Sequence, residues 1–316
     1  MVVIGGITRL TGSGLSITEW KIVTGTFPPL SELSWQKEFD AYKKIPQYKL
    51  INSDFTLHDF KHIYFWEYLH RLIGRIIGIV FLIPFLWFLI QKKIPTGFLP
   101  KIVLLFALGG FQGFLGWFMV KSGLSENIHV SHYRLAVHLI SAFTVFGFTY
   151  WFGLDLFFAE TSSVIENKKI KRYAYILLVT VILQIIYGAF VAGLKAGYGY
   201  PTWPKMGNVW FPFDEFVLEP FWKNFTEGHA GVQFIHRYLA YIVTGITGIL
   251  FYHGQNLPSN TIVKKAINFL LILVLSQFIL GVITLLFGVP ILIATLHQTG
   301  AFFIFGVILL ILHRIR

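Results

Sequence analysis

Four histidines lie inside long apolar stretches, and they are the side chains best suited to chemistry in this chain. His70, His138, His236 and His297 each stand roughly 6–8 residues from the same end of their stretch, hence at a similar depth if the stretches are helices. An ionisable residue within a membrane span is costly and usually faces the interior of a helix bundle. One such histidine is most simply a hydrogen-bonded packing residue, but four at matched depth favour ligation. Two imidazoles on facing helices can bind the iron of one haem, so the sequence predicts two haem sites, His70 with His138 and His236 with His297.

Glu67 distinguishes the two predicted sites. It precedes His70 by three positions, so both side chains share a helix face, and Gln233 stands in the equivalent position before His236. Arg71, four residues after Glu67, offers a purely structural ion pair, and both interpretations stay open on the sequence. A carboxylate beside only one of two duplicated ligands indicates that this site carries out the chemistry, whereas the other stores or passes electrons.

Several arginines near the same end of the predicted bundle are suited to the propionates of a haem. A guanidinium can bind a carboxylate through two parallel hydrogen bonds, and the predicted contacts are Arg9, Arg71, Arg75 and Arg237. Anchoring to lipid phosphates is the alternative, and it is the interpretation favoured for Arg134 and Lys195.

These side chains need helices to position them, and the composition indicates helices that cross a membrane. Of the 316 residues, 55% are hydrophobic and 13% are charged, about half the charged share of a soluble protein. A helix needs about 20 apolar residues to cross the hydrocarbon core, with its backbone polar groups bonded internally. The pattern predicts spans at 64–90, 101–120, 132–158, 172–195, 231–253, 264–287 and 290–313. Residues 1–8 are similar to the last turns of one more span, of which we expect the larger part to be missing.

An internal repeat relates the two parts of the chain. Glu67-Tyr-Leu-His-Arg71 matches Gln233-Phe-Ile-His-Arg237, Ala136-Val-His138 corresponds to Ala294-Thr-Leu-His297, and the pattern Gln-x-x-x-Gly recurs at Gln112, Gln184 and Gln277. With the first helix counted, four helices are followed by four more. The sequence therefore predicts an all-α polytopic membrane protein of two pseudo-symmetric four-helix bundles, residues 1–160 and 161–316.

The distribution of charge predicts the orientation. A net charge of +11 would favour nucleic-acid binding in a soluble protein, but here the basic residues gather in segments 91–101, 160–172 and 254–265 and in the C-terminal tail. These segments alternate along the chain, so the positive-inside rule places them on the inner side, and we expect no nucleic-acid partner. Segments 9–63 and 196–230 then lie outside, and short interfacial helices are predicted near 34–50. The chain has no cysteine, which excludes disulfides, thiolate ligands and c-type haem attachment.

Motifs along the whole chain resemble those of heme A synthases, in the cysteine-free branch found in mitochondria and α-proteobacteria. The matching segments, in family order, are Gly-Gly-Ile-Thr-Arg-Leu-Thr-Gly-Ser-Gly-Leu-Ser (5–16), Trp-Lys-Ile-Val-Thr-Gly (20–25), Pro-Pro-Leu-Ser-Glu (28–32), Glu-Tyr-Leu-His-Arg-Leu-Ile-Gly-Arg (67–75), Tyr-Arg-Leu-Ala-Val-His-Leu (133–139), Gly-Ala-Phe-Val-Ala-Gly-Leu-Lys-Ala-Gly (188–197), Thr-Trp-Pro-Lys-Met (202–206), Gln-Phe-Ile-His-Arg (233–237) and His297-Gln298.

The resemblance implies eight helices in two halves and oxidation of the C8 methyl of haem O to a formyl group, giving haem A for cytochrome oxidase. It implies a haem b cofactor on His236 and His297, haem O as substrate between His70 and His138, and Glu67 beside the reacting methyl. Other branches carry a cysteine pair in the first outer loop, and its absence here argues against a thiol step.

The resemblance also implies a multi-pass protein of a bacterial or mitochondrial inner membrane, with the histidines near the periplasmic or intermembrane side. An electron donor is required, and the haem O synthase and a second copy of the chain are candidate partners.

Two other functions stay open on the residues alone. One is a diheme cytochrome b-type carrier that takes electrons from quinol, and the other is a haem-transporting membrane protein. An electron relay usually places one haem near each membrane face, whereas all four histidines are predicted near one face. Extracted haems would separate the three functions, because only the synthase converts haem O to haem A.

Overall fold

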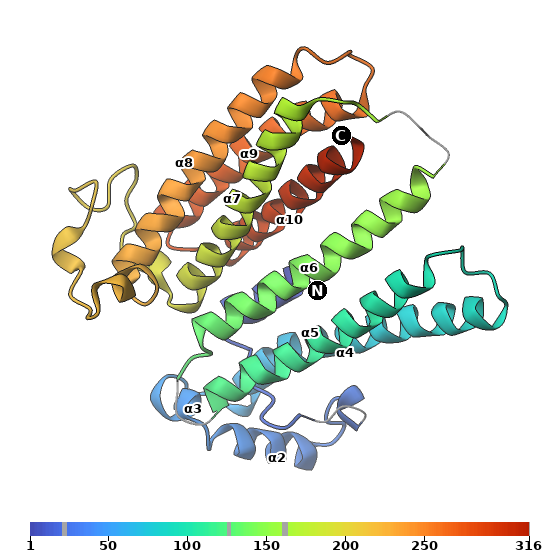
Figure 1. Ribbon diagram of the computed structural model, residues 1–316. Helices are drawn as coiled ribbons and strands as arrows, with labels where there is room; N and C mark the ends of the chain where they lie inside the picture. Colours follow the sequence, from blue (N-terminus) through green and yellow to red (C-terminus); the bar gives the residue numbers. More distant parts are fainter. Residues whose placement is uncertain (21–23, 125–127, 160–163, 316) are drawn as a thin grey trace. The chain divides into compact units, whose positions relative to one another are not determined.

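The computed structural model describes residues 1–20, 24–124, 128–159 and 164–315, and these residues are almost entirely helical (Figure 1). Part of the 20–25 motif therefore lies outside the described residues. The α-helices are α1 (Val2–Leu10), α2 (Glu32–Tyr42), α3 (Pro46–Leu50), α4 (Leu57–Ile90), α5 (Leu99–Leu124), α6 (His132–Phe157), α7 (Lys168–Gly193), α8 (His229–Gly254), α9 (Ile262–Leu286) and α10 (Ile291–Arg314). Short 3₁₀ turns are η1 (Thr24–Thr26), η2 (Ala196–Tyr198), η3 (Phe213–Glu215) and η4 (Phe221–Phe225).

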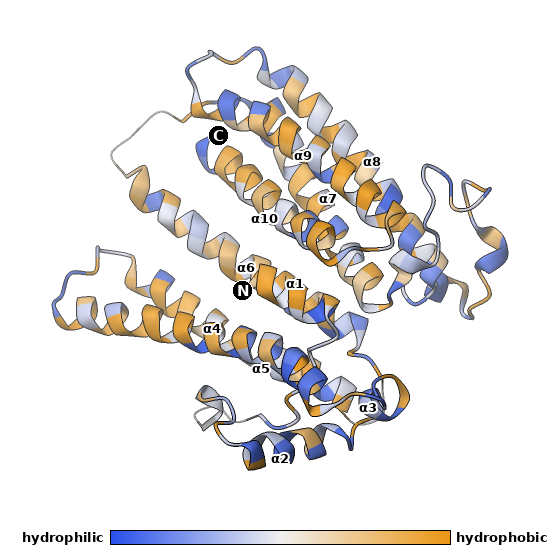
Figure 2. Ribbon diagram, turned by 180° about the vertical axis from the view of Figure 1, so that it is seen from behind, coloured by the Kyte–Doolittle hydropathy of each residue, from blue (hydrophilic) through white to orange (hydrophobic). Residues whose placement is uncertain are grey.

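Seven helices of the described residues, α4 to α10, are long and apolar enough to cross a membrane, which confirms the predicted polytopic helical fold. Figure 2 shows apolar residues along these helices and polar residues concentrated in the connections. The largest difference from the predicted boundaries is the start of α4, at Leu57 instead of residue 64. A capping box explains it: the Thr56 side chain accepts from the Asp59 backbone N–H, and the Asp59 carboxylate accepts from the Thr56 N–H. The cap begins the helix before its apolar stretch does.

Helices α7, α8, α9 and α10 form a closed four-helix bundle. Each packs against the next, and α10 returns to contact α7. The side chains of Asn167 and Thr261 cap α7 and α9, while Pro290 precedes α10. Between α9 and α10 the chain reverses through Gly288 and Val289, both with positive φ. The bundle core is aliphatic and includes Ile170, Leu177, Leu250, Ile267, Leu270, Ile308 and Ile311.

Helices α1, α4 and α5 pack in sequence with the short α2, which lies on the first part of α4. An aromatic cluster holds α2 there: the Tyr42 and Phe60 rings are 5.3 Å apart, and those of Phe39 and Phe60 are 5.1 Å apart. Tyr42 and Phe60 are fully buried. The short helices predicted near 34–50 are therefore present as α2 and α3.

The chain divides into two compact units, Met1–Ser141 and Ala142–Arg316, and the division falls inside α6. In the second unit, the C-terminal part of α6 packs on α10 through Phe143 against Phe305 and Phe146 against Phe302. The pseudo-symmetric halves 1–160 and 161–316 are defined by the sequence repeat and stay a prediction.

Candidate functional site

His236 on α8 and His297 on α10 face each other within the C-terminal bundle. Their ring centres are 6.5 Å apart, and the ring planes are inclined by 79°. If both rings bound one metal ion through bonds of about 2 Å, as imidazole–metal bonds are, the ring centres would lie about 6 Å apart. The observed spacing thus fits an ion shared by the two rings.

A hydrogen bond at Nδ1 of His297 determines which ring nitrogen is available to bind a metal. Its Nδ1 lies 3.1 Å from the backbone carbonyl oxygen of Gln277 and donates to it, because a carbonyl can only accept. The proton on Nδ1 leaves Nε2 with a free lone pair, which is the form of histidine that binds a metal. Nδ1 of His236 is buried.

This donor set suits haem better than a bare metal ion. Among the described residues no group of three or more His, Cys, Asp or Glu side chains could hold a metal. A haem iron needs only axial ligands from the protein. Two imidazoles at this spacing therefore fit the two axial positions of a haem.

His70 on α4 and His138 on α6 form the second predicted pair, and they lie near each other. Gln112 on α5 contacts His138 twice: its amide nitrogen is 3.2 Å from Nδ1 and donates to the backbone carbonyl at 3.1 Å. Gly5 of α1 lies directly against the His70 ring, and a Cβ there would be 3.1 Å from Nε2. The structure thus brings α1, α4, α5 and α6 together around this pair.

Glu67 is buried, one turn before His70, and its carboxylate is held from three directions. Oε2 accepts from the Ser16 hydroxyl at 2.7 Å and from the Ile17 backbone N–H at 2.9 Å. Oε1 accepts from Arg71 at 2.6 Å, so the ion pair that the sequence left open is present. The ion pair and a role in chemistry are not exclusive, because the carboxylate is fixed in one orientation beside the histidine.

The equivalent position in the C-terminal unit has the opposite polarity. Gln233 donates its amide N–H to the backbone carbonyl of Tyr200 at 3.4 Å. Arg237, the counterpart of Arg71, donates to the carbonyls of Tyr200 at 2.7 Å and Lys205 at 3.2 Å. A segment that follows α7 is thereby bound to α8 through its backbone oxygens.

The predicted propionate contacts are placed differently from one another. Arg71 donates to the carbonyls of Ile17 at 3.1 Å and Glu19 at 3.2 Å, so Arg71, like Arg237, fastens a connecting segment to its helix. Arg75 lies one turn further along α4, and Arg9 lies in the last turn of α1.

The backbone contacts of Arg71 and Arg237 were missed from the sequence. The Gly-Ser-Gly-Leu-Ser run at 12–16 is rich in turn residues, which is the sequence signal of an irregular backbone segment. In the structure this segment contacts Glu67 through Ser16.

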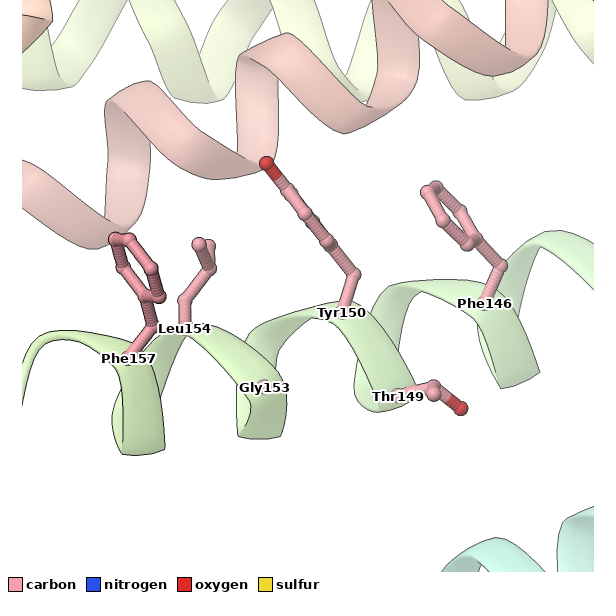
Figure 3. Close-up of a pocket in the computed structure, with 6 residues that line it drawn as sticks. All are labelled: Phe146, Thr149, Tyr150, Gly153, Leu154 and Phe157. Carbon is pink, nitrogen blue, oxygen red and sulfur yellow. The ribbon is translucent and has the colours of Figure 1, made fainter. Parts of the chain in front are cut away.

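A pocket in the C-terminal unit is lined by none of the predicted site residues. Its lining residues all come from α6: Phe146, Thr149, Tyr150, Gly153, Leu154 and Phe157 (Figure 3). The rings of Phe146 and Tyr150 point toward the neighbouring helix, and Thr149 points away from it. The lining includes no histidine and no charged group.

Fold and site together define a multi-pass α-helical membrane protein with paired histidines inside its spans. Residues 1–309 match the cytochrome oxidase assembly protein family, COX15-CtaA. The chain belongs to this family.

Similar proteins are aligned along almost the whole chain. The heme A synthase of Flavobacterium psychrophilum is 50% identical over 318 residues, which cover 99% of this chain and 93% of that protein. The heme A synthase of Parvibaculum lavamentivorans is 43% identical, with 100% of this chain and 90% of the relative aligned. That of Paracoccus denitrificans is also 43% identical, with 100% and 84% aligned.

Proposed function

We propose that the protein is a heme A synthase, a membrane oxidoreductase that converts the C8 methyl of haem O to the formyl group of haem A. Its similarity to proteins of that name along the whole chain supports this function over an electron carrier or a haem transporter. The observation that carries the proposal is Glu67, a buried and fully hydrogen-bonded carboxylate beside one histidine pair where the other pair has an amide. A carrier with two equivalent haems has no need of that difference.

In this proposal the two pairs hold different haems. His236 and His297 bind haem b as the resident cofactor, which supplies storage and transfer of electrons. His70 and His138 hold the substrate haem O, and Arg9, Arg71, Arg75 and Arg237 serve its propionates or those of the cofactor. The spacing of the C-terminal rings and the lone pair on Nε2 of His297 support the first assignment.

Glu67 acts on the reacting methyl group. Conversion of methyl to formyl removes four electrons from the carbon in two hydroxylation steps, the second followed by loss of water, and an external oxidant takes these electrons. Positive charge develops at the carbon as it is oxidised. A carboxylate held by Ser16, Ile17 and Arg71 cannot turn away, so it stabilises that charge or positions the water that reacts there. Its distance along the helix from His70 is one turn, which suits a group at the edge of a ligated haem.

Haem extraction tests the function directly. Membranes containing the protein are supplied with haem O, and the extracted haems are separated by chromatography. We expect haem A, together with a hydroxylated precursor, in proportion to the amount of folded protein. Recovery of unchanged haem O from protein that carries a full haem b spectrum would contradict the synthase and favour a carrier or a transporter.

The histidine-bearing ends of the helices are proposed to lie on the periplasmic or intermembrane side of an inner membrane. The basic residues near Lys168 and Lys264 support this, because they gather at the opposite ends. Reporter fusions should place 164–168 on the inner side and 205–225 on the outer side. The reverse result would put all four histidines in the inner leaflet.

A further inference from the structure

The motif Gln-x-x-x-Gly occurs on three helices that each immediately precede a helix carrying a histidine ligand. In all three the glutamine amide donates to the backbone carbonyl of that histidine itself. The distances are 3.1 Å from Gln112 to His138, 3.1 Å from Gln184 to His236 and 2.6 Å from Gln277 to His297. The same backbone atom of the histidine is bonded at all three occurrences, which makes this a repeated arrangement and not an accident of packing.

The hydrogen bond from the glutamine fixes the position of the histidine along the axis of the helix bundle. A helical carbonyl has a second lone pair after its own helix bond is made, and within a membrane no water competes for it. An amide from the neighbouring helix therefore ties that helix to the histidine's own backbone. Sliding or rotation of the histidine relative to the preceding helix would break the bond.

The glycine of each motif makes the second contact, at the ring. A Cβ on Gly116 would lie 3.3 Å from Cε1 of His138, and one on Gly188 would lie 3.3 Å from Cε1 of His236. At Gly281 the distance to Cε1 of His297 would be only 2.9 Å, which requires a shift. Cε1 lies between the two ring nitrogens, so pressure on it tilts Nε2 away from its present direction.

Helix packing alone does not explain these glycines. Gly245 and Gly248 of α8 have open space where a Cβ would be, as does Gly113 of α5. Gly5 of α1 supports the special role of the motif glycines, because it lies against the remaining histidine, His70. All four predicted ligands thus have a glycine facing the imidazole.

We propose that Gln-x-x-x-Gly is a histidine seat, in which the glutamine holds the ligand's backbone and the glycine, one turn later, leaves the room that its imidazole needs to point Nε2 at a haem iron. The seat rests on the proposed function in that it takes His138, His236 and His297 as haem ligands. Gln112, Gln184 and Gln277 are positioning residues, since they touch the histidines and not the iron.

The first test compares alanine at seat and non-seat glycines. Gly188→Ala and Gly281→Ala are purified beside Gly245→Ala and Gly248→Ala, which add the same methyl group to α8 without touching a ring. In the seat variants we expect a shifted low-spin ferric haem signal in electron paramagnetic resonance and roughly 10–100-fold weaker haem retention, as for other changes to groups that orient a metal ligand. The effect should be larger at Gly281 than at Gly188. The control variants should keep the wild-type signal.

The second test removes the amide. Gln184→Leu should weaken haem retention roughly tenfold or more, and Gln184→Glu should restore part of it, because a protonated carboxyl can still donate to the His236 carbonyl. Haem retention is measured per folded molecule and the paramagnetic resonance signal per bound haem, so a lower yield of folded protein alters neither. If wild-type protein holds bis-imidazole haem and the seat variants show the same haem retention and resonance signal as Gly245→Ala, the proposed role of Gln-x-x-x-Gly is contradicted and the proposed function is unaffected. If wild-type protein holds no such haem, the proposed function fails and the seat fails with it.

Discussion

His297 in the C-terminal unit and His138 in the N-terminal unit occupy matching positions of the repeat, yet their Nδ1 atoms meet different partners. Nδ1 of His297 donates to the carbonyl of Gln277, whereas Nδ1 of His138 faces the amide nitrogen of Gln112. His297 is thus oriented by a backbone oxygen, whereas His138 is oriented by the side chain of Gln112. A backbone partner has less freedom to move than a side chain, so the imidazole of His297 is the more firmly held of the two.

The packing of the helices around the two histidine pairs also differs. In the C-terminal unit α10 returns to α7 and closes the bundle, whereas in the N-terminal unit α4 contacts α1, α2 and α5. A closed bundle suits a cofactor that stays bound, because dissociation would require the packed helices to separate. In the proposed function, the more open packing of α1, α4 and α5 suits a haem that enters as substrate and leaves as product. The two ligand sets would then differ in helix packing as well as in the presence of Glu67.

The largest effect that separates the two pairs is loss of the resident haem. His236→Ala and His297→Ala should each abolish the low-spin haem b spectrum, because one axial ligand is removed from a buried iron. His70→Ala and His138→Ala should retain it. His229→Ala, at the exposed start of α8, is the matched control. Equal loss of the spectrum in all four variants would end the distinction between cofactor and substrate pairs.

The next effect is on turnover. Glu67→Gln should keep haem b and fold, but convert haem O roughly 10²–10³-fold more slowly, as for loss of one placed electrostatic contact. Gln233→Glu is the reciprocal change, and it should leave the N-terminal chemistry intact while loosening the segment around Tyr200, whose carbonyl would then face a carboxyl group. Chromatography of extracted haems per folded molecule gives both rates. A wild-type rate in Glu67→Gln would leave the Arg71 ion pair as the whole role of Glu67.

The smallest effect concerns the support of Glu67. Ser16→Ala removes one hydrogen bond to a charged group, worth about 1.5–3 kcal/mol, so turnover should fall roughly 10–100-fold at most. The haem b spectrum should not change. Thr284→Ala removes a hydroxyl that bonds only within its own helix and serves as control. An unchanged rate in Ser16→Ala would show that Ile17 and Arg71 suffice to orient the carboxylate.

The membrane helices were predictable because hydropathy and length decide them. The predicted span 132–158 and α6, His132–Phe157, differ by one residue at one end. The start of α4 was missed by seven positions, since a capping box and not hydropathy determines it. Pairing of His236 with His297 followed from the repeat, and the structure places their rings 6.5 Å apart.

The supports of the site were not predictable in the same way. Ile17, Tyr200 and Lys205 contribute backbone groups from irregular segments, and these contacts depend on the path of the chain and not on residue type. Ser16 contributes its hydroxyl, but only the path of the chain brings that hydroxyl to Glu67. The Gln-x-x-x-Gly pattern was visible as a repeat, but its meaning required the neighbouring helix. Sequence spacing shows which residues share a face, whereas contacts across helices need coordinates.

The opposite polarity at Glu67 and Gln233 constrains how the two halves can diverge. Glu67 receives a backbone N–H from Ile17, whereas Gln233 gives an N–H to the carbonyl of Tyr200. A carboxylate can only accept hydrogen bonds, whereas an amide can donate or accept. A glutamine at position 67 could therefore still accept from the Ile17 N–H, but a glutamate at position 233 would bring two acceptors together in a buried place. The path of the backbone thus restricts the acid to the N-terminal half, and the amide is the side chain that both halves can accommodate.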